Sequence, residues 1–277
     1  PVPHVLGVAE GESYYLQEDL GNMLLFNAIE KGRAASAFSQ EEKELLRKTI
    51  RLLPSIQFAG ADGFDFNHCY PQPEFNQRSI LWDLNYFKYC FLKATGLEFQ
   101  EDKLEDDFQK MSDVLLRSSS ATFMYRDFQS RNVMIKDGEP WFIDFQGGRK
   151  GPFFYDVASF LWQAKARFPE TLRNELLDEY IQALCKYKPV DRTYFFNQLR
   201  HFVLFRTLQV LGAYGFRGYF EKKPHFIQSV PFAIENLRQL LKEDYPEYPY
   251  LCQVLRELTE MKQFKDVGMR KPLVVRV

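Results

Sequence analysis

The stretch YRDFQSRNVMIKDGEPWFIDFQGG, residues 125–148, is the part of the chain that decides its fold. The segments NVMIK and PWFIDF have the composition of two β-strands, and the DG pair between them is a two-residue turn of the kind that joins antiparallel strands. Such a hairpin returns the chain on itself. We therefore expect Asp144, at the far end of the hairpin, to lie near Asp127 and Asn132 at its start.

These three residues have the functional groups that phosphoryl transfer requires. An amide carbonyl and a carboxylate are oxygen ligands that suit Mg²⁺, which is usually held by one or two carboxylates together with substrate phosphates. The remaining carboxylate is then free to take a proton from a hydroxyl group. Acidic residues also favour turns for purely structural reasons, and we interpret Asp137 in this way. Spacing, order and hairpin context favour a catalytic role for Asp127, Asn132 and Asp144.

The N-terminal part of the chain changes in character at Gly21. Before it, residues 4–9 and 13–17 are short apolar segments joined by a Gly-Glu turn, a pattern that predicts a second hairpin. After it, helical patterns begin with residues 22–32. The prediction is therefore a fragment of β structure followed by a helical region.

Most of the remaining chain has helical periodicity. Ser39 and Glu42 form the signature of a capping box at the start of a helix over 39–53. Residues 60–77 contain Gly, Pro, Asn and Asp without a sustained period and predict a loop. The fold class predicted from these patterns is α+β with helix dominant. Further helices are predicted at about 78–94, 101–118, 153–166, 169–187, 191–220, 224–243 and 247–264.

The composition of the 277 residues excludes few classes of partner. Lys and Arg number 36 against 37 Asp and Glu, so the balance gives no reason to expect a nucleic-acid or membrane partner. No apolar run approaches the ~18–20 residues of a membrane span. The four cysteines are far apart and form no C-x-x-C pair, which favours unpaired thiols and a cytoplasmic setting. No pattern indicates an oligomeric state.

The segments YRDFQSRN and FIDFQGGRKGPFFYDVASFL resemble the catalytic and metal-binding loops of the aminoglycoside phosphotransferase and choline kinase superfamily, which is related to the protein kinases. The resemblance covers essentially the whole helical region. It implies a two-lobed, protein-kinase-like fold that uses ATP and Mg²⁺. It also implies that Asp127 is the catalytic base and that Asn132 and Asp144 bind Mg²⁺.

The segment YYLQEDLG is similar to the last strand and hinge of the ATP-binding lobe in that superfamily, where backbone groups of Gln17, Glu18 and Asp19 would meet adenine. The Gly-rich phosphate loop of the family, its Lys and its Glu partner have no counterpart here, so we expect them to precede Pro1. The division that follows is a remnant of the β lobe and hinge (1–20), a helical phosphotransferase lobe (21–265) and a tail that is a candidate start of a further domain (266–277).

Within the superfamily, DFQ followed by GPFFYD, and later FRTLQVLGAYGFRGYFEKK, are similar to bacterial sugar kinases that phosphorylate the anomeric hydroxyl of N-acetylmuramate and N-acetylglucosamine. This favours a small-molecule kinase with an amino-sugar acceptor. One alternative keeps the fold and takes an aminoglycoside or a choline-type acceptor. Another is a non-catalytic pseudokinase or adapter, suggested by the missing phosphate loop.

The chain departs from the family pattern at two positions. Tyr125 stands where the family usually has His, a change that should affect support of the loop and not the reaction. The pair Gly147 and Gly148 stands where the sugar-kinase branch often has another Asp. Asp156, in GPFFYD, corresponds to the aspartate that supports the catalytic loop in the resembling kinases. For Arg149 and Lys150 the alternatives are steering of an anionic substrate and membership of a solvated turn, and the pattern favours the turn.

Four further residues are candidates for contact with the acceptor. Trp82 and Asp83 offer a stacking face and a hydroxyl acceptor that suit a sugar, or form an ordinary helix start. Arg131 presents a planar donor fork to a phosphate or carboxylate, or stabilises its loop through a salt bridge. Arg206 faces the acceptor or makes an internal ion pair.

Overall fold

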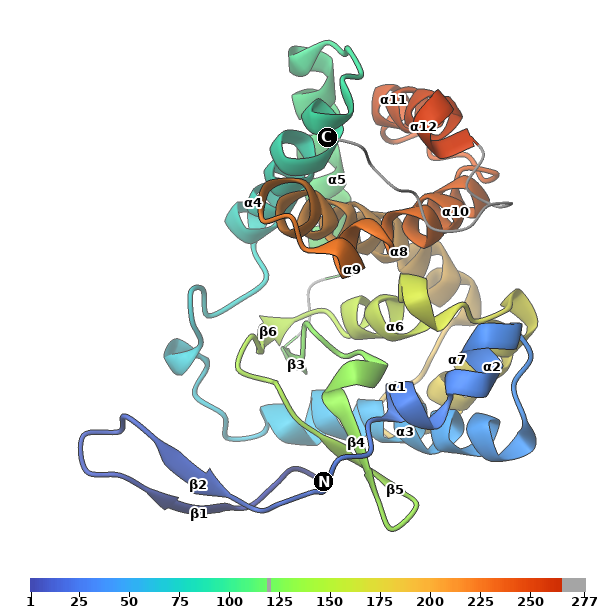
Figure 1. Ribbon diagram of the computed structural model, residues 1–277. Helices are drawn as coiled ribbons and strands as arrows, with labels where there is room; N and C mark the ends of the chain where they lie inside the picture. Colours follow the sequence, from blue (N-terminus) through green and yellow to red (C-terminus); the bar gives the residue numbers. More distant parts are fainter. Residues whose placement is uncertain (119–120, 266–277) are drawn as a thin grey trace. The chain divides into compact units, whose positions relative to one another are not determined.

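Short strands and many helices make up the protein in the computed structural model, which describes residues 1–118 and 121–265 (Figure 1). The predicted α+β class is confirmed. The strands are β1 (Val5–Val8), β2 (Tyr15–Gln17), β3 (Thr122–Met124), β4 (Val133–Lys136), β5 (Glu139–Phe142) and β6 (Arg149–Gly151). The longer helices are α3 (Gln40–Phe58), α4 (Gln77–Phe87), α5 (Glu101–Leu116), α6 (Phe154–Leu161), α7 (Glu170–Leu184), α8 (Arg192–Tyr214), α10 (Val230–Leu240) and α11 (Pro249–Glu260).

Shorter helical segments connect these elements. The α-helical ones are α1 (Leu25–Ala28), α2 (Glu30–Ala35), α9 (Pro224–Ile227) and α12 (Lys262–Lys265), and the π-helical ones are η3 (Lys88–Leu92) and η7 (Gly215–Phe220). The 3₁₀ turns are η1 (Ala59–Ala61), η2 (Phe66–His68), η4 (Lys93–Thr95), η5 (Ser130–Asn132) and η6 (Ala164–Ala166).

The strands pair as three separate two-stranded antiparallel sheets. The predicted hairpins are both observed, as β1–β2 and β4–β5. Asp137 and Gly138 form the turn of the second hairpin with φ angles of 54° and 76°, the left-handed backbone that such a tight turn requires. The pair β3–β6 was not predicted, because each strand has only three residues and no turn signal joins them.

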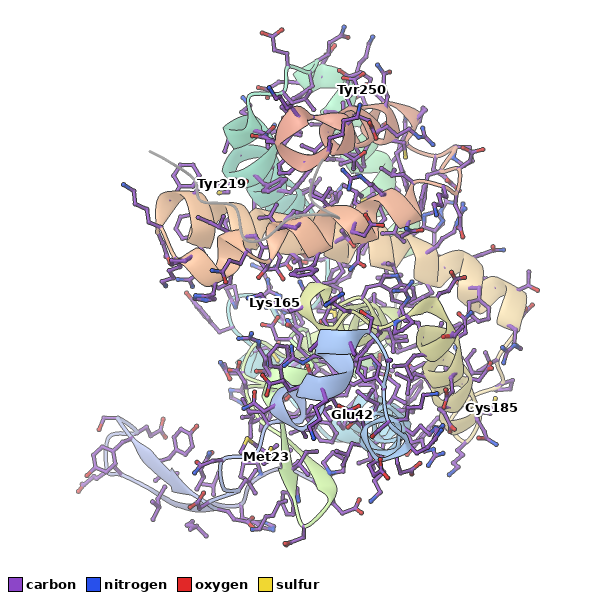
Figure 2. All side chains as sticks on the ribbon, turned by 45° about the vertical axis from the view of Figure 1, so that its right-hand side comes forward. Met23, Glu42, Lys165, Cys185, Tyr219 and Tyr250 are labelled. Carbon is purple, nitrogen blue, oxygen red and sulfur yellow. The ribbon has the colours of Figure 1, made fainter. Side chains whose placement is uncertain are left out.

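Helix α3 begins as its sequence predicts. The Ser39 hydroxyl accepts from the Glu42 N–H (3.2 Å) and the Glu42 carboxylate accepts from the Ser39 N–H (2.8 Å), so the capping box is confirmed. Glu42, labelled in Figure 2, also accepts from the N–H of Gly32 (2.8 Å) and thereby ties α2 to the start of α3. The helix continues past the predicted end, through Pro54, to Phe58.

The chain divides into two units. The first comprises Pro1–Glu74, Ala121–Leu161 and Ala166–Asp191, and the second comprises the described residues within 75–120, 162–165 and 192–277. In the first unit α3 packs on α7, with an ion pair between Arg51 and Glu179 (2.7 Å) at their surface. The stretch of residues 125–148 lies entirely in this unit, between β3 and α6.

The second unit is a helical bundle in which α8 packs against α4, α5 and α10. A Cβ atom on Gly215 would lie 2.1 Å from the carbonyl oxygen of Cys90, so only glycine allows the two segments to approach this closely. Among the described residues no helix combines the length and the apolar character needed to cross a membrane.

The boundaries predicted for the three parts of the chain are not tested by these two units and stay predictions. The predicted tail, 266–277, lies outside the described residues.

Candidate active site

A buried carboxylate holds the start of the loop that follows β3 and carries Asp127. The N–H groups of Tyr125 and Arg126 donate to the two oxygens of Asp156, at 2.9 Å and 2.8 Å. Asp156 is fully buried, and Arg126 has a φ of 75°, which is unusual for a residue other than glycine. The paired hydrogen bonds stabilise this strained backbone, so the predicted supporting role of Asp156 is confirmed.

Two further buried polar side chains orient Asp156. The Gln57 amide donates to an Asp156 oxygen (3.1 Å) and to the carbonyl of Phe153 (3.0 Å). The Tyr180 hydroxyl donates to the Gln57 amide oxygen at 2.7 Å. Because this bond engages the oxygen, it fixes which way the amide points and turns its NH₂ group towards Asp156. The three side chains come from α3, α6 and α7, and sequence reasoning identified only Asp156 as part of the site.

Tyr125 connects the two loops of the site. Its hydroxyl donates to the carbonyl of Ile143, the residue before Asp144. Burial raises the pKa of Tyr125, and the carboxylates of Asp144, Asp156 and Asp127 raise it further, so the phenol stays protonated and keeps its donor role. Tyr125 thus supports the loop, and the expectation that this departure from the family pattern leaves the reaction unaffected stays a prediction.

The β4–β5 hairpin brings the end of the motif back to its start. The Ile143 N–H donates to the Asn132 carbonyl (3.1 Å), and Val133 pairs with Phe142 across the sheet. Asp144 follows Ile143 directly. The convergence of Asp144 with Asn132 and Asp127, expected from the DG turn, is therefore seen in the backbone.

The side chain of Asn132 is held in one orientation. Its amide NH₂ group donates to the backbone carbonyl of Asp127 (2.9 Å), which leaves the amide oxygen as the group available to a cation. Asp144 is exposed, has a φ of 67°, and accepts a hydrogen bond from the Gln146 amide (2.6 Å). The two oxygen donors fit Mg²⁺ as a hard cation.

The described residues contain no group of three or more His, Cys, Asp or Glu side chains that would hold a metal ion. A Mg²⁺ ion held by this amide and this carboxylate would take its further oxygen ligands from phosphates and water, as is usual in phosphoryl-transfer enzymes.

The two glycines at the end of the motif, Gly147 and Gly148, differ in how closely other atoms surround them. A Cβ atom on Gly148 would lie 2.2 Å from the ring of Phe123, whereas one on Gly147 would meet only the Arg126 side chain, at 3.8 Å. Gly148 is required by packing, and Gly147 has room for a side chain. Arg149 is 2% exposed and lies in β6, so its prediction as part of a solvated turn is wrong.

The residues predicted to meet adenine lie at and after the end of β2. The Glu18 N–H donates to the His4 carbonyl (2.8 Å), and its carboxylate pairs with Lys136 (2.7 Å). The hydrogen bond from Lys136 lowers the pKa of Glu18. Asp19 accepts from the Gly21 N–H (2.8 Å), and Gln17 pairs with β1.

The residues predicted to contact the acceptor are divided between the units. Arg131 lies in the first unit, with its guanidinium carbon 4.2 Å from the ring centroid of Phe26. Trp82, Asp83 and Arg206 belong to the second. Trp82 and Asp83 lie in the second turn of α4 and not at its start, since α4 begins at Gln77. Trp82 is half exposed, and Arg206 is buried and donates to Gln209.

Comparison with known sequences identifies one matching family model and several relatives. The sequence model described as "Phosphotransferase enzyme family" matches residues 1–194. The N-acetylmuramate/N-acetylglucosamine kinase of Neisseria meningitidis serogroup B is 28% identical over 266 residues, covering 93% of this chain and 75% of that protein. Its namesake from Pseudomonas aeruginosa is 23% identical over 266 residues, covering 94% and 74%.

Among solved structures, the choline kinase LicA of Streptococcus pneumoniae is similar to this chain, with a TM-score of 0.54 at 12% sequence identity. The similarity covers 87% of this chain and 75% of that chain, and at this identity it shows the fold alone.

Proposed function

Because the chain belongs to the phosphotransferase enzyme family, and is a kinase that phosphorylates a hydroxyl group of a small molecule, we propose that it transfers the γ-phosphate of ATP to the anomeric hydroxyl of an amino sugar. The observation that carries this proposal is the pair of joined loops that brings Asp127, Asn132 and Asp144 together. The names of the two sequence relatives support the choice of acceptor.

In this proposal Asp127 acts on the acceptor. Its carboxylate accepts a hydrogen bond from the anomeric hydroxyl and orients the oxygen towards the γ-phosphorus. As the new P–O bond forms and the bond from phosphorus to the leaving ADP oxygen breaks, the proton of the hydroxyl passes to Asp127. The Asp156 carboxylate and Tyr125 hydroxyl hold the loop that carries this base.

Asn132 and Asp144 are the proposed Mg²⁺ ligands, through the amide oxygen and the carboxylate. Bound Mg²⁺ would supply positive charge that offsets the charge on the transferring phosphates. The hydrogen bond from the Asn132 NH₂ group to the Asp127 carbonyl orients the ligand oxygen and connects it to the loop of the base.

Further contacts are proposed with the nucleotide and the acceptor. Backbone groups of Gln17, Glu18 and Asp19 are proposed to meet adenine, and Trp82 and Arg206 stay candidates for acceptor contact, together with Asp83. The proposed setting is the cytoplasm, which agrees with the four free thiols at Cys69, Cys90, Cys185 and Cys252.

The test uses Asp127→Asn in the full-length protein, with N-acetylglucosamine as acceptor and ADP release as the readout. Loss of the base should lower kcat by about 10²-fold or more. Mg-ATP should still raise the melting temperature, because nucleotide that binds the folded state stabilises it. The matched control is Asp137→Asn, which makes the same chemical change in the turn of the same hairpin and should keep wild-type activity.

Wild-type turnover in Asp127→Asn would contradict the assigned role. A panel of hydroxyl acceptors tests the substrate separately. Strong turnover of an aminoglycoside or choline with none of either N-acetylated sugar would keep the kinase and overturn the proposed acceptor.

A further inference from the structure

Two arginines stack on one phenylalanine ring beside the catalytic loop. The guanidinium carbons of Arg33 and Arg131 lie 3.4 Å and 4.2 Å from the ring centroid of Phe26. Two guanidinium groups this close to one centroid would overlap if they shared a face, so they lie on opposite faces of the ring. The stack joins α1, α2 and η5, all within the first unit.

Arg33 has a structural role in this stack. Its Nε donates to the backbone carbonyl of Phe26 at 2.9 Å, which holds the ring against the side chain. Burial lowers the pKa of Arg33, the carboxylate of Glu30 acts in the opposite direction, and the positive charge of Arg131 lowers it further. The two positive charges therefore interact across the ring, and an anion beside them would be stabilised.

Arg131 is the exposed member of the stack. Within residues 1–118 and 121–265 no acidic side chain pairs with it, so the salt bridge considered from the sequence is not seen. Stacking on Phe26 engages the face of the guanidinium and leaves its in-plane N–H groups available. Those N–H groups form the fork that binds a carboxylate or phosphate through two parallel hydrogen bonds.

The position of Arg131 relates it to the acceptor. It directly precedes Asn132, whose amide is bonded to the Asp127 carbonyl, so it stands on the same short loop as the proposed base. Asp127 and Asp144 both contribute negative charge to this region, which would repel an acceptor that carries a carboxylate. Arg131 offsets that repulsion and supplies a specific partner.

We propose that Arg131, held by its stack on Phe26, binds the carboxylate of an acidic acceptor sugar. This rests on the proposed function and extends it from amino sugars in general to those that bear a carboxylate. N-acetylmuramate carries such a group on its lactyl ether, whereas N-acetylglucosamine has a hydroxyl at the same position. The two sugars are therefore a matched pair that differs in the group Arg131 recognises.

The experiment compares kcat/KM for the two sugars in the wild type and in Arg131→Gln. Loss of a charged, bidentate contact should lower kcat/KM for N-acetylmuramate relative to kcat/KM for N-acetylglucosamine by about 10- to 100-fold. The KM for ATP should stay unchanged. Arg131→Lys, which keeps the charge and loses the fork, should fall between the two. Arg256→Gln is the matched control, because it removes the same charge from an exposed arginine on α11 in the second unit.

Calorimetric titration of each sugar, with a non-hydrolysable ATP analogue present, gives a readout apart from turnover. The Kd of N-acetylmuramate should rise by a similar factor in Arg131→Gln, and that of N-acetylglucosamine should change much less.

Each other outcome overturns the inference in a recognisable way. An unchanged ratio with a raised KM for ATP would assign Arg131 to a nucleotide phosphate. An unchanged ratio and unchanged KM for ATP would leave it no role in binding. If the wild type phosphorylates neither sugar, the proposed function fails and the inference fails with it. If the wild type phosphorylates both sugars and Arg131→Gln leaves the ratio of their kcat/KM values unchanged, only the inference fails.

Discussion

Replacing Tyr180 by Phe removes one oxygen atom from the buried network behind the catalytic loop and leaves the ring in place. In the wild type that hydroxyl donates to the Gln57 amide oxygen at 2.7 Å, and Tyr180 and Gln57 are both fully buried. The variant leaves the amide oxygen without this donor, at a cost of about 1–3 kcal/mol in the free energy of unfolding. In a chain of this size that corresponds to a melting temperature lower by roughly 2–10 °C.

The same change should reach the reaction through Asp156. Without the tyrosine hydroxyl, the Gln57 amide is no longer fixed in the orientation that donates to Asp156, which in turn holds the N–H groups of Tyr125 and Arg126. We expect kcat to fall about 3- to 10-fold, corresponding to roughly 1 kcal/mol in the barrier. KM for the acceptor should change little, since both side chains are fully buried.

The assay combines urea denaturation with steady-state kinetics, and Tyr187→Phe is the control. Tyr187 loses the same atom, but it is 43% exposed and its ring stacks on Phe58. It should therefore unfold and turn over as the wild type does. A Tyr180→Phe protein with wild-type stability and wild-type kcat would refute the argument that this hydroxyl orients Gln57.

Two other predictions concern packing and pH. Gly148→Ala places a methyl group against the Phe123 ring and should destabilise the protein by about 1–3 kcal/mol. Gly147→Ala is the control and should be tolerated. Equal midpoints of denaturation in the two variants would show that the packing of Phe123 against Gly148 is not tight. Burial lowers the pKa of His201 from 6.5 to about 4, so the unfolded chain binds a proton that the folded chain does not, and the free energy of unfolding should fall by up to about 3 kcal/mol as pH drops from 6.5 towards 4. His201→Gln should remove this part of the pH dependence when the two proteins are compared by denaturation at each pH, and identical curves would contradict the assignment.

Features that depend on a few consecutive residues were predictable from the sequence. The capping box at Ser39 and the turn at Asp137 each involve groups within four residues of one another, so their geometry follows from local chemistry. The approach of Asp144 to Asn132 was predictable for the same reason, because the turn between them sets the register of the hairpin.

Contacts between distant segments were not predictable in this way. The pairing of β3 with β6 joins two three-residue strands that have no alternation of their own. Gln57 and Tyr180 meet only because α3 packs on α7. A signal for Gln57 was nevertheless present, since it continues the buried stripe of Leu46, Ile50 and Leu53, and a polar residue at such a position needs a partner.

The partners of the charged residues also depended on tertiary structure. Arg149 follows a glycine pair and has the composition of an exposed turn, yet its strand pairs with β3 and buries it. The stack of Arg131 on Phe26 was not predicted, because Phe26 lies in a helix far earlier in the chain and no local pattern joins the two residues.

The positive φ angles of Arg126 and Asp144 have a consequence for how the enzyme uses binding energy. Each conformation costs of the order of 1–3 kcal/mol, and neighbouring contacts within the folded chain compensate for it. The loops are thus held in shape within the folded chain, and under the proposed function ligand binding would not have to supply the energy that shapes the loop of Asp127. Affinity for the acceptor could then be used to align its hydroxyl group.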